Sequence, residues 1–303
     1  MKSERAVETP SNILTFIVGL SSSAASCHPH SQEMCYLCTR QCFVGSTIHR
    51  HHTTRPTMTT SHTKPTLAPQ APFSGIKAIA FDADDTLWDC QSHFVEVERR
   101  YCALLKDYGT AEEVSAALFR TETANMPLLG YGCKAFTLSL VENAVAVSHG
   151  HVDGATIGEI VALGKQLLTI NATPLPEVES TLQAFLDEGR YPLVVFTKGE
   201  LLDQENKLRR SGLLRFFSHV EIVSDKTRHA FLSLCRRLKI SPSSLLMVGN
   251  SFKSDVAPAL EIGAAAVHVP FHVTWQLEHA EEYAHERLVR AASFGEVFRC
   301  VEH

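Results

Sequence analysis

Five short apolar runs after residue 76 constrain the fold of this chain more than any other feature. Helix-like stretches separate the last four runs: Leu202–Ser211, Ala230–Leu238 and Ser254–Ile262. The runs are Lys77–Asp82, Pro192–Thr197, His219–Val223, Leu245–Gly249 and Ala265–Pro270. Strands that alternate with helices form right-handed βαβ units, so this pattern predicts an α/β fold with a doubly wound parallel sheet. In such sheets ligands bind at the carboxyl ends of the strands.

A long insertion separates the first two predicted strands. It spans about 110 residues, far more than a crossover normally needs. Apolar residues recur in it at helical spacing, as in the set Phe94, Val97, Tyr101, Leu104 and Leu105. We therefore predict a helical cap over residues 91–187, above the carboxyl end of the first strand, between the core segments 75–90 and 188–303.

Composition excludes several classes of protein. Hydrophobic residues form 45% of the 303-residue chain, which is enough for a core, and no run of about 18 apolar residues predicts a membrane span. A net charge of -5 lacks the basic surface that nucleic-acid binders need. Nine cysteines are too few for a disulfide-based fold of this size, so we expect reduced thiols and a cytoplasmic protein.

Residues 1–74 differ from the rest of the chain. They contain 27 Ser, Thr or Pro residues, and their net charge is +3 while that of the remainder is -8. A stretch of this composition buries too little apolar surface to offset chain entropy, so we predict a disordered leader.

Three other interpretations of the leader compete with disorder. The apolar run 13–20 resembles a short signal-peptide core, although Glu4 and Glu8 are unusual in a signal leader. A zinc site is a second interpretation, with candidate ligands Cys27, His28, His30, Cys35, Cys38 and Cys42. In the third, Met58 is the true start of the protein.

Carboxylates follow the first predicted strand directly, in the sequence Asp82-Ala83-Asp84-Asp85-Thr86. Asp82 and Asp84 would repel one another unless a cation lay between them. A carboxylate beside bound Mg²⁺ can attack phosphorus while its neighbour transfers the proton. The alternative is a turn that only caps the next helix, with Asp85 or Thr86 as the capping residue.

The later strand ends carry complementary groups. Thr197, Lys198 and Gly199 follow the second strand, where a hydroxyl and backbone N–H groups suit phosphate oxygens. Lys226 follows the third strand and is a candidate phosphate ligand. Asn250 and Asp255 follow the fourth strand and offer oxygen ligands to a hard cation.

Together these four segments resemble the motifs of the haloacid dehalogenase-like hydrolase superfamily, over roughly residues 76–303. The resemblance implies a Rossmann-like core and a C1-type helical cap. It also implies a phosphatase that hydrolyses a small phosphorylated metabolite through an aspartyl-phosphate. Asp82 would be the nucleophile and Asp84 the general acid/base, while Thr197 and Lys226 would bind the phosphoryl group. Mg²⁺ would be held by Asp82, the Asp84 carbonyl and the fourth motif.

The fourth motif departs from the family pattern, because Asn250 stands where Asp is usual. We expect weaker Mg²⁺ binding, with Asp255 supplying the anionic ligand. Dehalogenases of the superfamily typically lack the second aspartate, so Asp84 favours phosphoryl transfer. A catalytically inactive phospholigand-binding protein and a phosphomutase stay open as alternatives.

In the cap, the Gly130–Gly132 turn presents Tyr131 and Lys134 as candidate substrate contacts, or forms an ordinary interhelix turn. We expect Trp88 in the core, and His268, His272 and Trp275 in packing or at the rim of the site.

Overall fold

The computed structural model describes residues 17–18 and 73–303. The predictions for the leader, namely disorder, the zinc ligands, the signal peptide and the Met58 start, fall on residues 1–74 and lie almost entirely outside the described residues. Within the described parts, no helix combines the length and apolar character that crossing a membrane requires.

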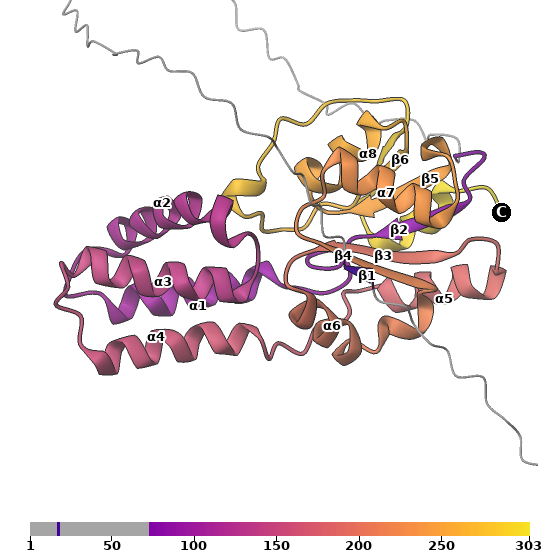
Figure 1. The fold of residues 1–303 in the computed structure, drawn as a ribbon. Coiled ribbons are helices and arrows are strands. Elements are labelled where there is room, and N and C mark those ends of the chain that lie inside the picture. Colours follow the sequence, from indigo (N-terminus) through magenta and orange to yellow (C-terminus); the bar gives the residue numbers. More distant parts are fainter. Residues whose placement is uncertain (1–16, 19–72) are drawn as a thin grey trace, which may run out of the picture. The chain divides into compact units, whose positions relative to one another are not determined.

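A seven-stranded parallel sheet forms the core, with the strand order β1-β4-β3-β2-β5-β6-β7 (Figure 1). The strands are β1 Ile17–Val18, β2 Ala78–Phe81, β3 Leu193–Lys198, β4 His219–Val223, β5 Leu245–Gly249, β6 Ala265–His268 and β7 Leu288–Arg290. The doubly wound α/β prediction is confirmed. The sequence pattern missed only the short strands β1 and β7.

Burial on both faces explains why the central strands are apolar throughout. All four residues of β2 are buried. Ile79 and Phe81 belong to the hydrophobic cluster on one face, while Ala78 and Ala80 belong to the cluster on the other. A strand covered on both sides cannot place polar residues on either face, so it appears as a continuous apolar run.

In the described residues, eight α-helices surround the sheet or form the insertion. They are α1 Gln91–Leu104, α2 Ala111–Leu129, α3 Cys133–Val147, α4 Gly154–Leu167, α5 Val178–Glu188, α6 Leu201–Arg210, α7 Arg228–Leu238 and α8 Ala257–Glu261. Local signals fix several of their ends. A capping box between Thr110 and Glu113 starts α2, and the Asp153 side chain accepts two backbone N–H bonds at the start of α4.

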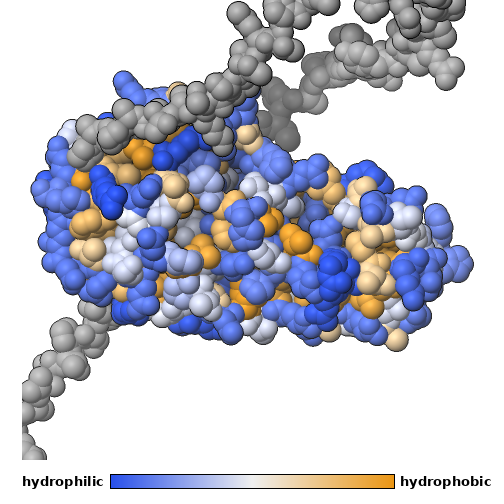
Figure 2. Space-filling view, turned by 180° about the vertical axis from the view of Figure 1, so that it is seen from behind, coloured by the Kyte–Doolittle hydropathy of each residue, from blue (hydrophilic) through white to orange (hydrophobic). Residues whose placement is uncertain are grey.

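Hydrophilic residues cover most of the face in Figure 2.

The inserted helices have a hydrophobic core of their own. Tyr101 of α1, Leu118 of α2, Leu140 of α3 and Ile160 of α4 are fully buried in one cluster, and α1–α4 lie together as a bundle beside the sheet (Figure 1). Helix α5 packs instead against the sheet, with Phe185 in the main core cluster. The expected helical insert is therefore present, and α1–α4 are the part that packs on itself.

The order of the strands places a crevice at the end of β2. Strand β2 lies between β3 and β5, so the chain leaves it in opposite directions on its two sides. At such a switch point the loops diverge and leave space for a ligand. The backbone N–H of Asp82 still donates to Val248 O at 2.9 Å, which holds the first residue after β2 at the sheet edge.

Candidate active site

Asp82 lies in the centre of the site, in contact with a buried lysine. Lys226 Nζ donates both to Asp82 Oδ1 and to Asp255 Oδ1, the latter at 2.6 Å. The Lys226 and Asp255 side chains are each 1% exposed, and that of Asp82 is 10% exposed. Three residues predicted from separate strand ends therefore meet in one charged cluster.

The charge balance of this cluster is unfavourable for an ionised Asp82. Burial and the neighbouring Asp255 raise the pKa of Asp82 to about 6, and Lys226 only partly counters them. Burial alone would lower the pKa of Lys226, but Asp255 and Asp82 outweigh it, so that pKa is raised and the lysine stays charged. A second cation beside Asp82 would favour the ionised carboxylate that nucleophilic attack requires.

Thr86 shows where that second cation fits. Its hydroxyl lies 3.1 Å from Asp82 Oδ2 and 3.1 Å from Asn250 Oδ1. A hydroxyl has one proton, so it can donate to only one of these two oxygens at a time. Two acceptor oxygens that converge without enough donors suit a hard divalent cation. The residues therefore fit Mg²⁺, with Asp82 and Asn250 side chains as candidate ligands and Asp255 behind them.

The side-chain amide of Asn250 belongs to this candidate donor set. In the described part of the chain, no three His, Cys, Asp or Glu side chains are grouped as a metal site. Asn250 is itself held in place, because its N–H donates to Thr86 Oγ1 at 3.0 Å and its carbonyl oxygen lies 2.9 Å from His268 Nε2. His268 is thus a buried packing residue that positions the fourth motif, in line with the packing role expected for it.

Four hydrogen bonds hold the Asp84 carboxylate. Lys207 Nζ donates to both of its oxygens at 2.7 Å, Gln204 Nε2 to Oδ2 at 2.7 Å and Trp88 Nε1 to Oδ1 at 2.7 Å. Burial pulls the pKa of Asp84 upward, but the Lys207 charge and these bonds outweigh it, and the net pKa is lowered. Trp88 is fully buried, as expected of a core residue, and it also donates to the site.

The turn after β3 supplies a hydroxyl and a cation. Thr197 is buried, with 2% of its surface exposed, and lines the cavity. Gly199 has φ +135°, a backbone conformation that other residues rarely adopt. Its N–H donates to Val223 O at 3.0 Å, so this amide belongs to the sheet edge and is not free for a phosphate.

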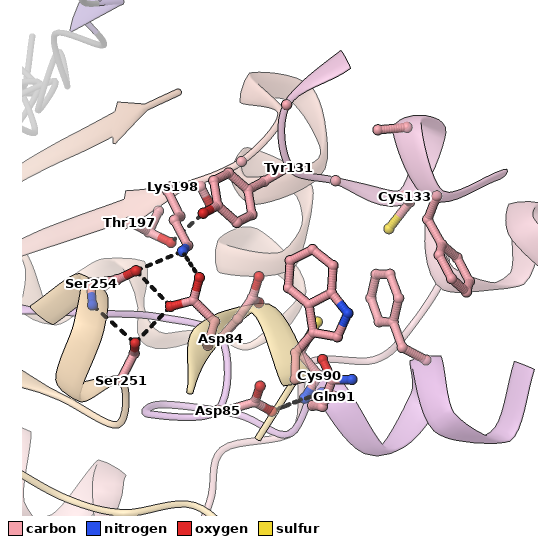
Figure 3. Close-up of a pocket in the computed structure, with 18 of the residues that line it drawn as sticks. Asp84, Asp85, Cys90, Gln91, Tyr131, Cys133, Thr197, Lys198, Ser251 and Ser254 are labelled. Atoms are coloured by element: carbon pink, nitrogen blue, oxygen red, sulfur yellow. Dashed lines mark hydrogen bonds and ion pairs between the residues drawn. The ribbon is translucent and has the colours of Figure 1, made fainter. Parts of the chain in front are cut away.

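Lys198 joins the cap to the core. Its Nζ donates to Ser254 Oγ at 2.7 Å and to Glu278 Oε1 at 2.6 Å, and it lies 3.8 Å from the centre of the Tyr131 ring. Figure 3 shows Lys198 between Ser254 and Tyr131. The Tyr131 ring also packs edge-on against Trp275 at 6.0 Å. Tyr131, which belongs to the cap, lines the cavity. Trp275, which was expected at the rim of the site, lines it too.

Lys134 does not face the cavity. Its side chain is 61% exposed and pairs with Glu200 at 2.5 Å, and its backbone N–H donates to the same glutamate. The other predicted site residues, apart from Lys134, do line one cavity of about 180 Å³ between α1–α3 and the sheet edge.

The sequence analysis did not predict several of the residues that line the cavity. Gln204, Lys207 and Glu278 contact the predicted site residues directly, and Glu98 and Glu122 line the far end of the cavity in the cap. Gln204 and Lys207 are three residues apart on a helix that begins just after Thr197-Lys198-Gly199, and this spacing places them on one helical face. That signal was available in the sequence, whereas nothing in it marks Glu278.

The sheet, the aspartates at its central edge and the helical insert define an α/β fold with a helical insertion beside a carboxylate-lined cavity. The chain belongs to the haloacid dehalogenase-like hydrolases, whose family model matches residues 76–263.

Known proteins similar to this chain agree with that assignment. The glyceraldehyde 3-phosphate phosphatase of Methanothermobacter thermautotrophicus is 28% identical over 227 residues, which cover 68% of this chain and 92% of the relative. The phosphatase of the same name from Pyrococcus furiosus is 28% identical over 69% of this chain and 87% of its own length. A haloacid dehalogenase-like family hydrolase from Xanthomonas campestris is 27% identical with a TM-score of 0.66, covering 76% of this chain and 94% of that chain.

Proposed function

We propose that this protein is a Mg²⁺-dependent phosphatase that hydrolyses a small phosphorylated metabolite through an aspartyl-phosphate. The observation that carries the proposal is the convergence of Asp82, Asp84, Thr197 and Lys226 on one cavity. A nucleophilic carboxylate, a second carboxylate, a hydroxyl and a buried ammonium are the groups that phosphoryl transfer needs.

The residues suggest a two-step reaction. Asp82 attacks phosphorus in line with the leaving oxygen, and Asp84 protonates that oxygen as the ester bond breaks. Water then attacks the aspartyl-phosphate after giving a proton to Asp84, and phosphate leaves. Lys226 and the Thr197 hydroxyl orient the phosphoryl oxygens throughout. When bound, Mg²⁺ would supply the positive charge that lets a carboxylate approach a phosphate dianion.

The composition of the cavity supports the need for that cation. Nine carboxyl groups and three lysines line it. Each of these lysines already pairs with a carboxylate: Lys198 with Glu278, Lys207 with Asp84 and Lys226 with Asp82. A phosphate ester entering this cavity would be repelled unless a further cation were bound first.

The size of the cavity favours a small ester. At about 180 Å³ it is smaller than the roughly 300–1,000 Å³ typical of pockets for drug-sized ligands. The curated relatives are named for glyceraldehyde 3-phosphate, so this ester belongs in a substrate panel with other short phosphorylated aldehydes, acids, alcohols and amines.

The test is phosphate release from such a panel by residues 70–303, with and without Mg²⁺. We expect release that depends on Mg²⁺, and a loss of about 10³-fold or more in Asp82→Asn, since the amide is not a nucleophile. Asp187→Asn, at an exposed position of α5, is the matched control and should keep wild-type turnover. Retention of most activity in Asp82→Asn would falsify the nucleophile assignment.

A non-catalytic phospholigand-binding protein is the second candidate, and Asn250 is the observation that favours it. The same panel separates the two functions. If no ester is hydrolysed but one of them raises the melting temperature, the binding function replaces the phosphatase.

A further inference from the structure

The cap end of the cavity holds two carboxylates that the proposed reaction does not use. Glu98 of α1 and Glu122 of α2 both line the cavity. The three lysines that line it belong to the core, with Lys198 in β3, Lys207 in α6 and Lys226 after β4. Among the described cap residues around the cavity there is no lysine or arginine. The wall of the cavity therefore supplies no cation for these two glutamates.

The two glutamates are also poorly supplied with hydrogen-bond donors. Glu98 Oε1 accepts from Ser115 Oγ at 2.6 Å. Within the described chain Glu122 has no hydrogen-bond or ion-pair partner. A carboxylate that is removed from water is costly unless it is paired, and burial, followed by the charge of Glu98, raises the pKa of Glu122. A positive group between the two side chains would relieve this repulsion.

Two acceptor atoms on the core side of the cavity lack donors as well. Asp203 and Gln204, near the start of α6, are 5% and 4% exposed, and both line the cavity. In the part of the chain that the structure describes, Asp203 Oδ1 and Gln204 Oε1 have no hydrogen-bond partner, although buried polar atoms are nearly always paired. A ligand that carries hydrogen-bond donors would satisfy them. This observation is independent of the cap glutamates and indicates the same kind of ligand.

Helix α1 relates the cap glutamates to the proposed phosphate site. Its residues Gln91, Phe94 and Glu98 all line the cavity. The backbone N–H of Gln91 donates to Asp85 Oδ1 at 2.8 Å, in the turn that follows β2. Seven residues of α-helix rise about 10 Å, so Glu98 lies about that far along the helix from the turn.

Aromatic rings line the cavity between its two ends. The ring centroids of Phe94 and Phe136 are 5.1 Å apart, and both residues line the cavity. Such rings pack against a methylene chain, and their faces attract a cation. The cavity thus combines a phosphate end in the core, an apolar middle and an anionic end in the cap.

We propose that Glu98 and Glu122 determine substrate specificity by binding a positively charged amine at the far end of the alcohol part of the phosphate ester. The proposal rests on the proposed phosphatase function and names its substrate class, the phosphorylated amino alcohols. The ammonium group donates charge-assisted hydrogen bonds to both carboxylates. The acceptor atoms of Asp203 and Gln204 suit a hydroxyl on the same chain, closer to the phosphate.

The test compares three esters of one chain length: hexyl phosphate, its terminally hydroxylated form and its terminally aminated form. The six-carbon chain has about the reach that α1 indicates, and the three esters differ only in the group at the far end. Phosphate release in the presence of Mg²⁺ gives kcat/KM for each. We expect the wild-type protein to prefer the aminated ester over both others by at least about tenfold, because two carboxylates attract its charge.

Variants that keep the size of the side chains isolate the charge. In the double variant Glu98→Gln, Glu122→Gln we expect the preference for the aminated ester to fall to about threefold or less. Each single variant should lie between the double variant and wild type, and the single variants decide if the double variant does not fold. Glu96→Gln is the matched control on the same helix, since Glu96 is 53% exposed and pairs with Arg99; it should keep the wild-type preference.

Equal kcat/KM values of the wild-type protein for the three esters would overturn the proposal, as would a preference that survives in a folded double variant. Equal values for the aminated and hydroxylated esters would also overturn it, because hydrogen bonding without charge would then suffice. Failure of the phosphatase proposal looks different: wild-type protein then releases no phosphate from any ester, or Asp82→Asn is as active as wild type.

Discussion

At the scale of single residues, the hydroxyl of Thr86 marks the candidate metal site. It lies 3.1 Å from both Asp82 Oδ2 and Asn250 Oδ1 and can donate to only one. An aspartate in place of Asn250 would bring a third carboxylate beside Asp82 and Asp255. The amide therefore reduces repulsion in the metal-free protein and lowers the charge available to a bound cation.

Asn250→Asp should strengthen Mg²⁺ binding. An added unit charge at about 4 Å from a divalent cation contributes about 2 kcal/mol even in water, so the Mg²⁺ concentration for half-maximal activity should fall by about 30-fold. Without Mg²⁺ the same variant should melt at a lower temperature than wild type. Titration of activity against Mg²⁺ and melting curves in EDTA measure both effects.

Asn171→Asp, at an exposed position, adds the same charge away from the site and serves as the control. An unchanged Mg²⁺ requirement in Asn250→Asp would remove Asn250 from the set of ligands.

Which site residues the sequence predicts depends on how they are attached to the fold. Asp82, Thr197, Lys226 and Asp255 follow strands, and the end of a parallel strand fixes where its next residues lie. The contacts of Lys134 were not predictable in this way, because its direction depends on how Gly132 and Glu200 meet across the cap and core. Glu278 follows an irregular loop, where no periodicity indicates which way a side chain points.

At the scale of elements, helix α2 carries an acidic residue into the interior of the cap. Glu122 lines the cavity; burial, and then the charge of Glu98, raise its pKa to about 7. In the unfolded chain the pKa of a glutamate is near 4.5. The folded cap therefore binds this proton more tightly than the unfolded chain does. The resulting stabilisation is complete below about pH 4.5 and is lost as the pH rises through 7.

Replacing Glu122 by glutamine should remove this pH dependence. Glu122→Gln keeps a neutral side chain of the same shape, so its melting temperature should exceed that of wild type increasingly between pH 5 and pH 8. Thermal melts at half-unit intervals of pH measure the difference. Glu159→Gln, at an exposed position of α4, is the control, and parallel curves for Glu122→Gln and wild type would contradict the assignment.

The elements themselves were largely predictable. Strands β2 to β6 and helices α6 and α7 begin and end within a few residues of the patterns that predicted them. A strand buried on both faces gives a continuous apolar run, and a helix buried on one face gives an apolar stripe. The predicted helix at 254–262 is instead a π-helical turn, Phe252–Val256, followed by the short α8. This local widening of the helix carries Asp255, and no sequence period distinguishes it from an ordinary helix.

At the scale of the whole molecule, the last sixteen residues complete the core although they lie beyond the region that matches the family. Phe294 packs 5.9 Å from the ring of Phe81 at the end of β2. Leu288, Val297 and Val301 are also buried, and the backbone N–H of Phe73 donates to Cys300 O at 2.8 Å. The C-terminal segment therefore supports β2, the strand that leads into Asp82.

Deletion of residues 288–303 should prevent stable folding. Four large apolar side chains would leave the core, each contributing roughly 1.5–3 kcal/mol, and their sum is comparable with the whole stability of a typical domain, about 5–15 kcal/mol. We expect the truncated protein to lose its cooperative thermal transition in circular dichroism. Deletion of His303 alone should keep the transition, and a cooperative transition in the longer deletion would show that the segment is dispensable.

The position of β2 in the sheet has a consequence for the chain during its synthesis. Its neighbours β3 and β5 both follow it along the chain, as do Lys226, Asn250 and Asp255. A nascent chain displays Asp82, the proposed nucleophile, more than a hundred residues before Lys226. A partial product of translation that stops before β5 therefore holds Asp82 without Asn250 and Asp255, and with one edge of β2 unpaired.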